Sequence, residues 1–447
     1  AILDHWFGTG GLGLDKNKIK YWSMDNEPDI WNGTHDDVMK TQPTAEAFMQ
    51  LYFAVAKKAR AKYPNIKLTG PVPASEWQWY SWNNSKITVG GKDYVWLEFF
   101  IKRIAEEQQA SGIRLLDVID IHSYPNETRD SDIVQLHRIY FDTTYVYPGA
   151  NGVKTTSPSG WDNTITKEYV FGRCNKWLTQ YMGPNHGVTF AVSEYGANNN
   201  SANVTAVSYS SILGTFADNS VELFTPWYWY PGMWETMHLY SRYAKTTRVQ
   251  SVSSQDRYVS AYSSINTVGD SMTVILVNRS LTASKNTTVN LAGFGVTNGS
   301  YKTLSINQLP STETFVSNTT NALKSSTVSV TGNSFTMSLP ALSTTAVILK
   351  GQLITGINEI PDDVLKATLY PNPVEGENAF IGISNEKLSD LKVELFNMLG
   401  EVVYSRIYTG TAGPVIEIPC GIIKQGVYII NLSSANGKKW NSRFVKL

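Results

Sequence analysis

Two glutamates follow expected β-strands and could act together in acid–base chemistry. Glu27 lies in Asn26-Glu27-Pro28, after an apolar run at 19–25, and Glu194 lies in Ser193-Glu194-Tyr195-Gly196, after a run at 188–193. The C-terminal ends of parallel strands share the face where such folds bind ligands. Splitting a glycosidic bond needs one protonated carboxyl for the leaving oxygen and one ionised carboxyl for the anomeric carbon. The pair therefore indicates glycoside hydrolysis, with two unrelated ion pairs as the alternative.

Alternating strands and helices would position these glutamates. We expect strands at 19–25, 66–70, 115–121, 188–193 and 221–229, and helices at 44–63, 94–111, 130–140, 167–181 and 203–217. Thr44 and Glu46 give the first helix a capping side chain and an acidic first turn. Strand–helix alternation predicts a parallel sheet, either doubly wound or closed into a barrel.

The second half of the chain has a different texture. From about residue 240, short β-branched segments such as 272–278 and 345–349 are separated by Gly, Asn or Ser. This pattern is typical of an antiparallel sandwich. We therefore divide the chain into a catalytic α/β region, a β-sandwich, a linker and a small Ig-like β-domain, at 1–238, 239–350, 351–366 and 367–447.

Composition excludes several classes of protein. A length of 447 residues suggests about two or three domains. Basic and acidic residues number 38 each, so a basic surface for nucleic acid or membrane is not expected. The two cysteines lie far apart, which excludes a thiolate zinc site, and no apolar run of about 18 residues could span a membrane. Aromatic residues make up 12%, which suits either sugar stacking or a large aromatic core.

Further side chains are expected around the crevice between the glutamates. The sequence Asp-Ile-His-Ser-Tyr at 120–124 closes an intervening strand, so His122 and Tyr124 should face the crevice. His122 could tune Glu194, bind a sugar hydroxyl or serve as a structural donor, and Tyr195 could orient the nucleophile or pack in the core. The remaining predicted substrate-binding residues are Trp31, Glu76, Trp79 and Trp229, with packing over the sheet as the alternative for the rings.

Metal ions and cofactors have little support in the sequence. Asp15, Asn17, Asp36 and Asp37 could supply oxygen ligands to a structural calcium, but their spacing fits no defined loop. Solvated acidic residues are the alternative. We predict no metal ligands and no required cofactor.

The longer context of the glutamates resembles glycoside hydrolase family 44. The resemblance rests on the sequence Tyr-Trp-Ser-Met-Asp-Asn-Glu-Pro-Asp-Ile-Trp at 21–31, on 120–124 and on 193–196, and covers roughly residues 1–350. It implies a retaining (β/α)8 TIM-barrel enzyme, packed against a β-sandwich, that cleaves internal β-1,4 bonds of cellulose derivatives, xyloglucan or glucomannan. It also implies that Glu27 is the acid/base, that Glu194 is the nucleophile, and that Asn26 binds the sugar 2-hydroxyl.

Two alternatives to this function stay open. One is another retaining enzyme of the same barrel clan, such as a xylanase, mannanase or arabinofuranosidase. The other is a non-catalytic glycan-binding protein. In the family pattern Glu27 ends the fourth barrel strand, yet only about 20 residues precede that strand, so we expect a fragment whose barrel lacks its first strands. An open sheet is the alternative.

The C-terminal 80 residues carry a second resemblance. Leu-Tyr-Pro-Asn-Pro at 369–373, Val-Glu-Leu-Phe-Asn-Met-Leu-Gly at 393–400 and Gly-Val-Tyr-Ile-Ile at 426–430 occur in order before a terminal Phe-Val-Lys-Leu. They resemble the bacterial type IX secretion sorting domain, with a generic carbohydrate-binding sandwich as the alternative. The resemblance implies a protein that is secreted or attached to the cell surface, with the type IX machinery and a β-glucan polysaccharide as partners. We expect a monomer.

Overall fold

A computed structural model describes residues 2–354, 367–383, 389–397, 400–411, 415–434 and 439–447. The chain divides into two compact units, Ala1–Leu353 and Ile354–Leu447. Most of the linker expected at 351–366 lies outside the described residues. No helix within those residues has both the length and the apolar character needed to cross a membrane.

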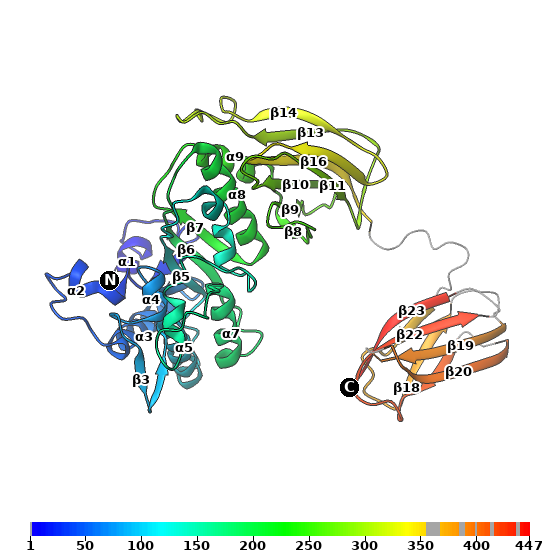
Figure 1. The fold of residues 1–447 in the computed structure, drawn as a ribbon. Helices are drawn as coiled ribbons and strands as arrows, with labels where there is room; N and C mark the ends of the chain where they lie inside the picture. Colours follow the sequence, from blue (N-terminus) through cyan, green and yellow to red (C-terminus); the bar gives the residue numbers. More distant parts are fainter. Residues whose placement is uncertain (1, 355–366, 384–388, 398–399, 412–414, 435–438) are drawn as a thin grey trace. The chain divides into compact units, whose positions relative to one another are not determined.

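A five-stranded parallel sheet forms the first part of unit one (Figure 1). Its strands, in spatial order, are β1 (Tyr21–Ser23), β2 (Lys67–Pro71), β5 (Val118–Ser123), β6 (Thr189–Tyr195) and β7 (Val221–Pro226). Every pairing along this order is parallel. The sheet confirms the half-barrel expected from the sequence, with β1 and β7 as its two edges in the described part of the chain.

Helices cover this sheet and connect its strands. They are α1 (Ile2–Phe7), α2 (Trp31–Thr34), α3 (Ala45–Lys62), α4 (Glu76–Tyr80), α5 (Trp96–Ser111), α6 (Asp130–Ile133), α7 (Val170–Met182), α8 (Ala202–Asp218) and α9 (Met233–Tyr243), with 3-10 turns η1 (Pro28–Ile30), η2 (Leu136–Ile139) and η3 (Val153–Thr156) and a hairpin of β3 (Ile87–Val89) and β4 (Lys92–Tyr94). The Thr44 hydroxyl accepts the Ala47 N–H at 3.1 Å, which confirms the predicted cap of α3. The helix expected at 130–140 is instead a short α-helix followed by a 3-10 turn.

The second part of unit one is the expected β-sandwich. It contains β8 (Thr247–Val249), β9 (Val259–Ile265), β10 (Ser271–Asn278), β11 (Lys285–Asn290), β12 (Phe294–Val296), β13 (Gly299–Ile306), β14 (Lys324–Val330), β15 (Ser334–Leu339) and β16 (Ser343–Leu353). Seven of these strands form one antiparallel sheet, and β11 pairs with β15 in a second. Val274 and Leu276 of the large sheet pack in one buried cluster with Phe335 and Leu339 of the small one.

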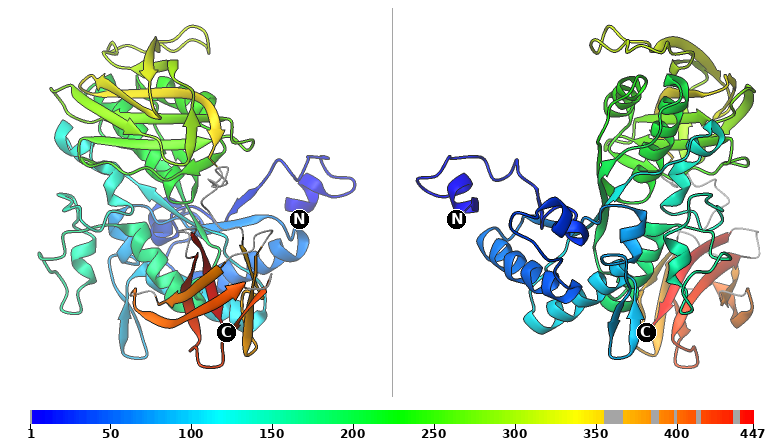
Figure 2. Two further views of the ribbon diagram at one scale, coloured as in Figure 1. Left: turned by 90° about the vertical axis from the view of Figure 1, so that its right-hand side faces the viewer. Right: turned by 60° about the vertical axis from the view of Figure 1, so that its left-hand side comes forward.

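The sandwich packs tightly against helix α8. Figure 2 shows the helices α8 and α9 in green beside the yellow-green sheet. At Gly214 in α8, an added Cβ would lie 2.3 Å from the Tyr262 ring of β9, so only glycine permits this approach. Ile275 and Ala346 of the sandwich belong to the same buried core as the parallel sheet. This shared core explains why the two expected regions form one compact unit.

Unit two is a small antiparallel β-domain with its own core. Its strands are β17 (Ala367–Tyr370), β18 (Asn378–Ile383), β19 (Ser389–Phe396), β20 (Val402–Thr411), β21 (Val415–Pro419), β22 (Gly426–Ser434) and β23 (Lys439–Lys446). They form a three-stranded and a four-stranded sheet. Residues from both sheets, among them Ile381, Leu395 and Ile430, are buried in one cluster. Unit two therefore has a buried core separate from that of unit one.

Candidate active site

Glu27 lies on the loop that follows β1, in a backbone conformation that is rare for a non-glycine residue. Its φ and ψ are 46° and 54°, in the left-handed region. The Glu27 N–H donates to the Val72 carbonyl oxygen at 3.1 Å, and Val72 also has a positive φ of 57°. Strained backbone of this kind persists only where surrounding contacts hold it, and it concentrates at functional sites.

Glu194 is placed by a β-bulge in β6. In the pairing of β5 with β6, Ile121 lies opposite Val192, but His122 lies opposite Glu194, so Ser193 is the extra residue. The Ser193 N–H donates to Asp120 Oδ1 at 3.0 Å, which satisfies the amide that the bulge removes from the ladder. The bulge therefore brings the Glu194 carboxylate directly beside the end of β5.

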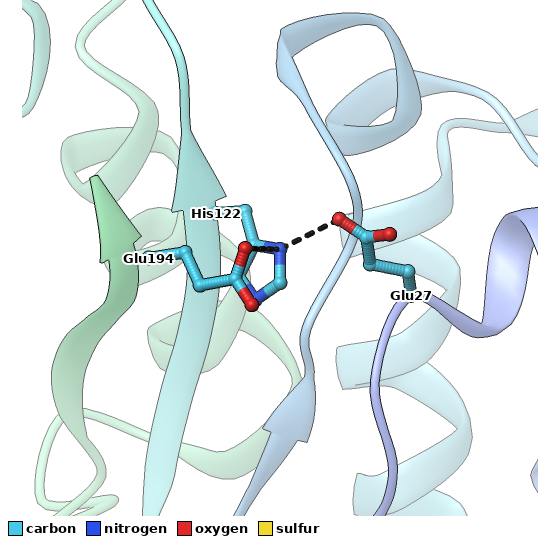
Figure 3. A group of neighbouring side chains, drawn as sticks. All are labelled: Glu27, His122 and Glu194. Carbon is cyan, nitrogen blue, oxygen red and sulfur yellow. Dashed lines mark hydrogen bonds and ion pairs between the residues drawn. The ribbon is translucent and has the colours of Figure 1, made fainter. Parts of the chain in front are cut away.

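His122 lies between the two glutamates (Figure 3). Its Nδ1 is 2.8 Å from Glu27 Oε1 and 3.3 Å from Glu194 Oε2, and the imidazole is almost completely buried. One side-chain nitrogen of His122 and one carboxylate oxygen of each glutamate all lie within 4.8 Å of one another. The two carboxyl groups predicted from the sequence are therefore neighbours on one face of the sheet.

Tyr124 completes this cluster. Its hydroxyl donates to Glu194 Oε2 at 2.6 Å. Burial, together with the neighbouring Glu194 carboxylate, raises the pKa of the Tyr124 hydroxyl well above its usual value, so this group remains a donor. His122 and Tyr124 both approach Oε2, which leaves Glu194 Oε1 as the oxygen available to a substrate.

Two buried aspartates lie behind the catalytic rim. Burial raises the pKa of Asp29 to about 7, and the Ala74 N–H approaches its Oδ2 at 3.4 Å. Burial also raises the pKa of Asp120 to about 6. The Asp120 carbonyl accepts the Val72 N–H at 3.0 Å, and Val72 in turn accepts from Glu27. Asp120 thus supports the backbone at both glutamates, a role that the sequence analysis missed because it depends on contacts between strands.

Three of the predicted aromatic residues have roles other than the one expected. Trp31 and Trp79 are 5% and 2% exposed, so neither offers a free ring face to a sugar. Trp31 Nε1 donates to the Asn26 carbonyl, and Trp79 Nε1 to the His122 carbonyl, each at 2.9 Å. Tyr195 is buried against Phe224, which agrees with the core-packing alternative, and Tyr124 makes the contact with Glu194.

Trp229 is partly exposed, and its ring contacts two other aromatic residues. It stacks on Trp234 with centroids 4.1 Å apart and an angle of 16°, and Tyr209 meets it edge-on. Trp234 in turn stacks on Phe315 of the sandwich. The role of Trp229 as a sugar platform stays a prediction, because its ring is 39% exposed but already stacks on Trp234. Strand β7 ends at Pro226, so Trp227 is an exposed ring on the loop.

The other predicted residues lie near the rim without touching the glutamates in the described structure. Asn26 is exposed beside Glu27, where its side chain could reach a ligand. Glu76 accepts the Gly152 N–H at 2.8 Å and lines a separate pocket together with Trp79 and Tyr124. These two substrate-binding roles stay predictions.

Among the described residues, Glu27, His122 and Glu194 are the only group of acidic, His or Cys side chains close enough to hold a metal ion. Asp15, Asp36 and Asp37, which were considered for a structural calcium, do not form such a group in the described part of the chain. That no metal or cofactor is required stays a prediction.

Comparison with known proteins agrees with this geometry. Residues 5–127 match the family model described as glycoside hydrolase family 44. This part of the chain is therefore similar to family 44. Residues 368–446 match the model of a secretion system C-terminal sorting domain, which indicates export to the cell surface or beyond. Glu27 and His122 lie within the family 44 match, whereas Glu194 lies outside it.

Two curated proteins are similar to this chain at low sequence identity. The chain is 24% identical over 314 residues to a β-mannanase/endoglucanase A of Caldicellulosiruptor saccharolyticus, covering 62% of this chain and 23% of that protein. It is 22% identical over 372 residues to an endoglucanase A of Paenibacillus lautus, covering 76% and 49%. The chain therefore spans about half or less of these curated relatives.

Solved structures give the same fold. A Paenibacillus polymyxa xyloglucanase from family 44 superposes with a TM-score of 0.63 at 20% identity, covering 78% of this chain and 69% of that one. A family 44 endoglucanase from Clostridium thermocellum gives a TM-score of 0.61 at 20% identity, covering 74% and 66%. These similarities establish the fold class predicted from the sequence.

Proposed function

We propose that this chain acts as a secreted endo-β-1,4-glucanase that retains anomeric configuration. The observation that carries the proposal is the closeness of the two carboxyl groups, because one oxygen of Glu27 lies within 4.8 Å of one oxygen of Glu194. Carboxyl groups about 5–5.5 Å apart are typical of retaining enzymes, whereas inverting enzymes leave about 6.5–9.5 Å for a water.

In the proposed reaction, Glu27 protonates the glycosidic oxygen while Glu194 Oε1 attacks the anomeric carbon. The bond from the anomeric carbon to the leaving oxygen breaks, and a covalent glycosyl-enzyme forms. Glu27, now ionised, is held by His122 at 2.8 Å and accepts a proton from water. That water attacks the anomeric carbon, releases Glu194, and restores the original configuration. Asn26 is proposed to hydrogen-bond the 2-hydroxyl at this stage.

The substrate is proposed to be an undecorated or branched β-1,4-glucan. Curated and structural relatives are named endoglucanase, xyloglucanase and β-mannanase/endoglucanase, which supports this class. Release of reducing ends from carboxymethylcellulose, xyloglucan, glucomannan and xylan would test it. Activity on the first three and not on xylan is expected, and cleavage confined to xylan would favour the xylanase alternative.

Two alanine variants test the mechanism. Glu27→Ala and Glu194→Ala should each reduce turnover by about 10³-fold or more, because each removes one half of the acid–nucleophile pair. External azide should restore the rate of one variant, with a glycosyl azide of defined configuration as the product. If both variants keep their glucan affinity and the wild type shows no turnover, the protein is a glycan-binding protein instead.

The C-terminal domain extends the proposal to export. The match to a secretion system sorting domain supports recognition by a secretion machinery, and we propose that this machinery is of type IX. Deletion of residues 367–447 should leave the enzyme inside the producing cell. We also propose a monomer, which light scattering would test.

A further inference from the structure

The separate pocket lined by Glu76, Trp79 and Tyr124 is a cavity beside the catalytic cluster. It has a volume of about 120 Å³, against the roughly 10–15 Å³ that one water requires. Tyr124, whose hydroxyl contacts Glu194, forms part of its wall, as does Ser123. Tyr124 therefore belongs both to the wall of this cavity and to the cluster at which the substrate is proposed to react.

The chemistry of the cavity wall is that of a sugar site. Carboxylates from Glu76 and Glu127 and amides from Asn126 and Asn151 line it together with Trp77. Sugars present vicinal hydroxyls on their edges and C–H groups on their faces, which suit carboxylates and aromatic rings respectively. Trp77 is 44% exposed and stacks on the exposed Trp161 with centroids 6.2 Å apart.

The cavity is also held open by its neighbours. Glu127 Oε2 accepts the Tyr147 hydroxyl at 3.0 Å, which fixes this carboxylate. A Cβ at Gly149 would lie 2.5 Å from Glu127 Oε1, so glycine at this position leaves room for that oxygen. The Gly152 N–H donates to Glu76 Oε1, which fastens the loop before η3 to the start of α4. None of these contacts involves Glu27 or Glu194.

We propose that this cavity is a subsite that binds one glycosyl unit of the glucan, with Glu127 receiving its hydroxyls and Trp77 supporting its face. This inference rests on the proposed function and deepens it. It makes Glu127 and Trp77 substrate-positioning residues rather than catalytic ones, and it assigns the 145–152 loop to substrate recognition.

Two variants test the subsite. Glu127→Gln keeps the size of the side chain, and Trp77→Ala removes an exposed ring, so neither should prevent folding. Each is expected to raise KM for carboxymethylcellulose or xyloglucan by about tenfold, with kcat changed less than about threefold. In a Glu194→Gln background, calorimetry should show a similar loss of affinity for cello-oligosaccharides and xyloglucan oligosaccharides. Glu375→Gln, an exposed carboxylate in the other unit, is the matched control.

The outcomes separate this inference from the proposed function. If wild type cleaves a glucan and both variants match the Glu375→Gln control in KM and affinity, the subsite is refuted and the function stands. If wild type neither cleaves nor binds any glucan of the panel, the proposed function fails and the subsite with it. A fall in kcat without a rise in KM would place Glu127 in the chemical step and would also refute the subsite.

Discussion

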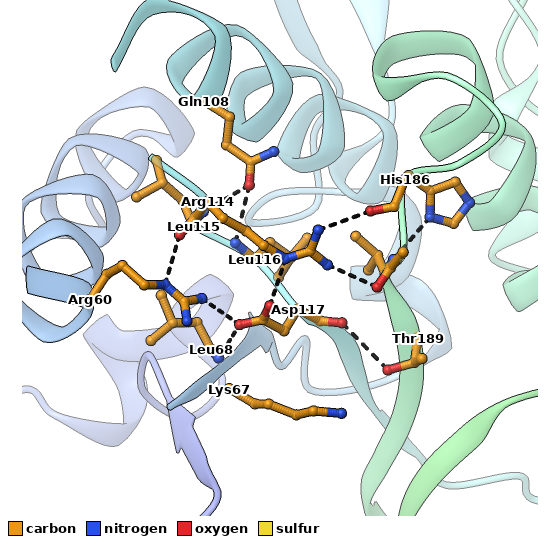
Figure 4. A network of polar contacts seen from close by, with 12 residues as sticks. Arg60, Lys67, Leu68, Gln108, Arg114, Leu115, Leu116, Asp117, His186 and Thr189 are labelled. Atoms are coloured by element: carbon orange, nitrogen blue, oxygen red, sulfur yellow. Dashed lines mark hydrogen bonds and ion pairs between the residues drawn. The ribbon is translucent and has the colours of Figure 1, made fainter. Parts of the chain in front are cut away.

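The two ends of strand β5 hold their carboxylates by different contacts. Asp117 directly precedes the strand, and His122 is its next-to-last residue. At the N-terminal end, Asp117 binds the guanidinium groups of Arg60 and Arg114 and accepts the Leu68 N–H at 2.9 Å (Figure 4). At the C-terminal end, the described residues place no Lys or Arg in an ion pair with Glu27 or Glu194.

The arginines at the N-terminal end also bind the backbone around them. Arg60 donates to the carbonyls of Ile66 and Arg114, and Arg114 donates to those of His186 and Gly187. Burial alone would raise the pKa of Asp117, but the Leu68 N–H and the two arginines outweigh it and hold that pKa below its usual value. One end of the sheet therefore stabilises the fold, and the other keeps carboxylates reactive.

The largest effect should come from the catalytic end. Glu194→Gln is expected to reduce kcat by about 10⁴-fold, equivalent to roughly 5 kcal/mol of transition-state stabilisation. Its thermal unfolding temperature should stay equal or rise, since the change removes a negative charge that lies close to Glu27. Parallel measurement of kcat and thermal unfolding tests both parts. A large loss of stability would show that Glu194 holds the fold together, contrary to the comparison.

The opposite result is expected at the N-terminal end. Asp117→Ala leaves two arginines without their carboxylate and should lower the free energy of unfolding by about 2–4 kcal/mol. The kcat of the folded fraction should change less than about twofold. Denaturant titration with activity assays on the same samples tests this, with Asp15→Ala as a control on an exposed turn. A specific fall in kcat would mean that the two ends are coupled.

The sequence predicted much of this division and missed its details for physical reasons. Strand-end positions of Glu27 and Glu194 follow from local apolar periodicity and from the shared edge of parallel strands. The left-handed backbone at Glu27 and the bulge at Ser193 depend on hydrogen bonds to Val72 and Asp120, which are distant in sequence. The local sequence pattern therefore does not predict these contacts.

Aromatic residues show the same limit. Composition indicates many rings but does not tell a packed ring from an exposed one, so Trp31 and Trp79 were expected at the surface although both are buried. Trp161, which stacks on Trp77, was not selected because it follows no predicted strand. The boundary between the half-barrel and the sandwich could be predicted from the change in residue pattern near residue 240. Their shared core could not, because it depends on the close approach of the two parts at Gly214.

Asp120 offers a finer test of the catalytic end. Asp120→Ala removes the acceptor of the Ser193 N–H, so the bulge should relax and kcat should fall by about 10–100-fold, or roughly 1.4–2.7 kcal/mol. Asp120→Asn should recover most of the rate, because an amide oxygen can accept the same bond. KM should change little in either variant. Equal losses in both would show that the charge matters rather than the hydrogen bond.

The smallest expected effect is a difference in pH dependence between the two ends. The pKa of Asp29 is raised to about 7 in the folded protein, so between about pH 4 and pH 7 the folded state binds a proton that the unfolded state has lost. Stability from this group is complete below the unfolded pKa and is lost as the pH rises towards 7. The lowered pKa of Asp117 gives the opposite sign, because its stabilisation is lost as the pH falls below about 4.

Asp29→Asn separates these contributions. Urea unfolding of wild type and variant should be measured at pH 5 and pH 6. Between these two pH values the free energy of unfolding of wild type should fall by up to about 1.4 kcal/mol relative to that of the variant. Asp117→Ala measured over the same interval should follow the slope of wild type, since Asp117 is ionised in both states there. A wild-type slope that Asp29→Asn leaves unchanged would mean that the Asp29 carboxyl is already ionised at pH 5. The catalytic end would then hold a third charged carboxylate beside Glu27, and the contrast with the ion-paired end would be stronger than the buried position of Asp29 implies.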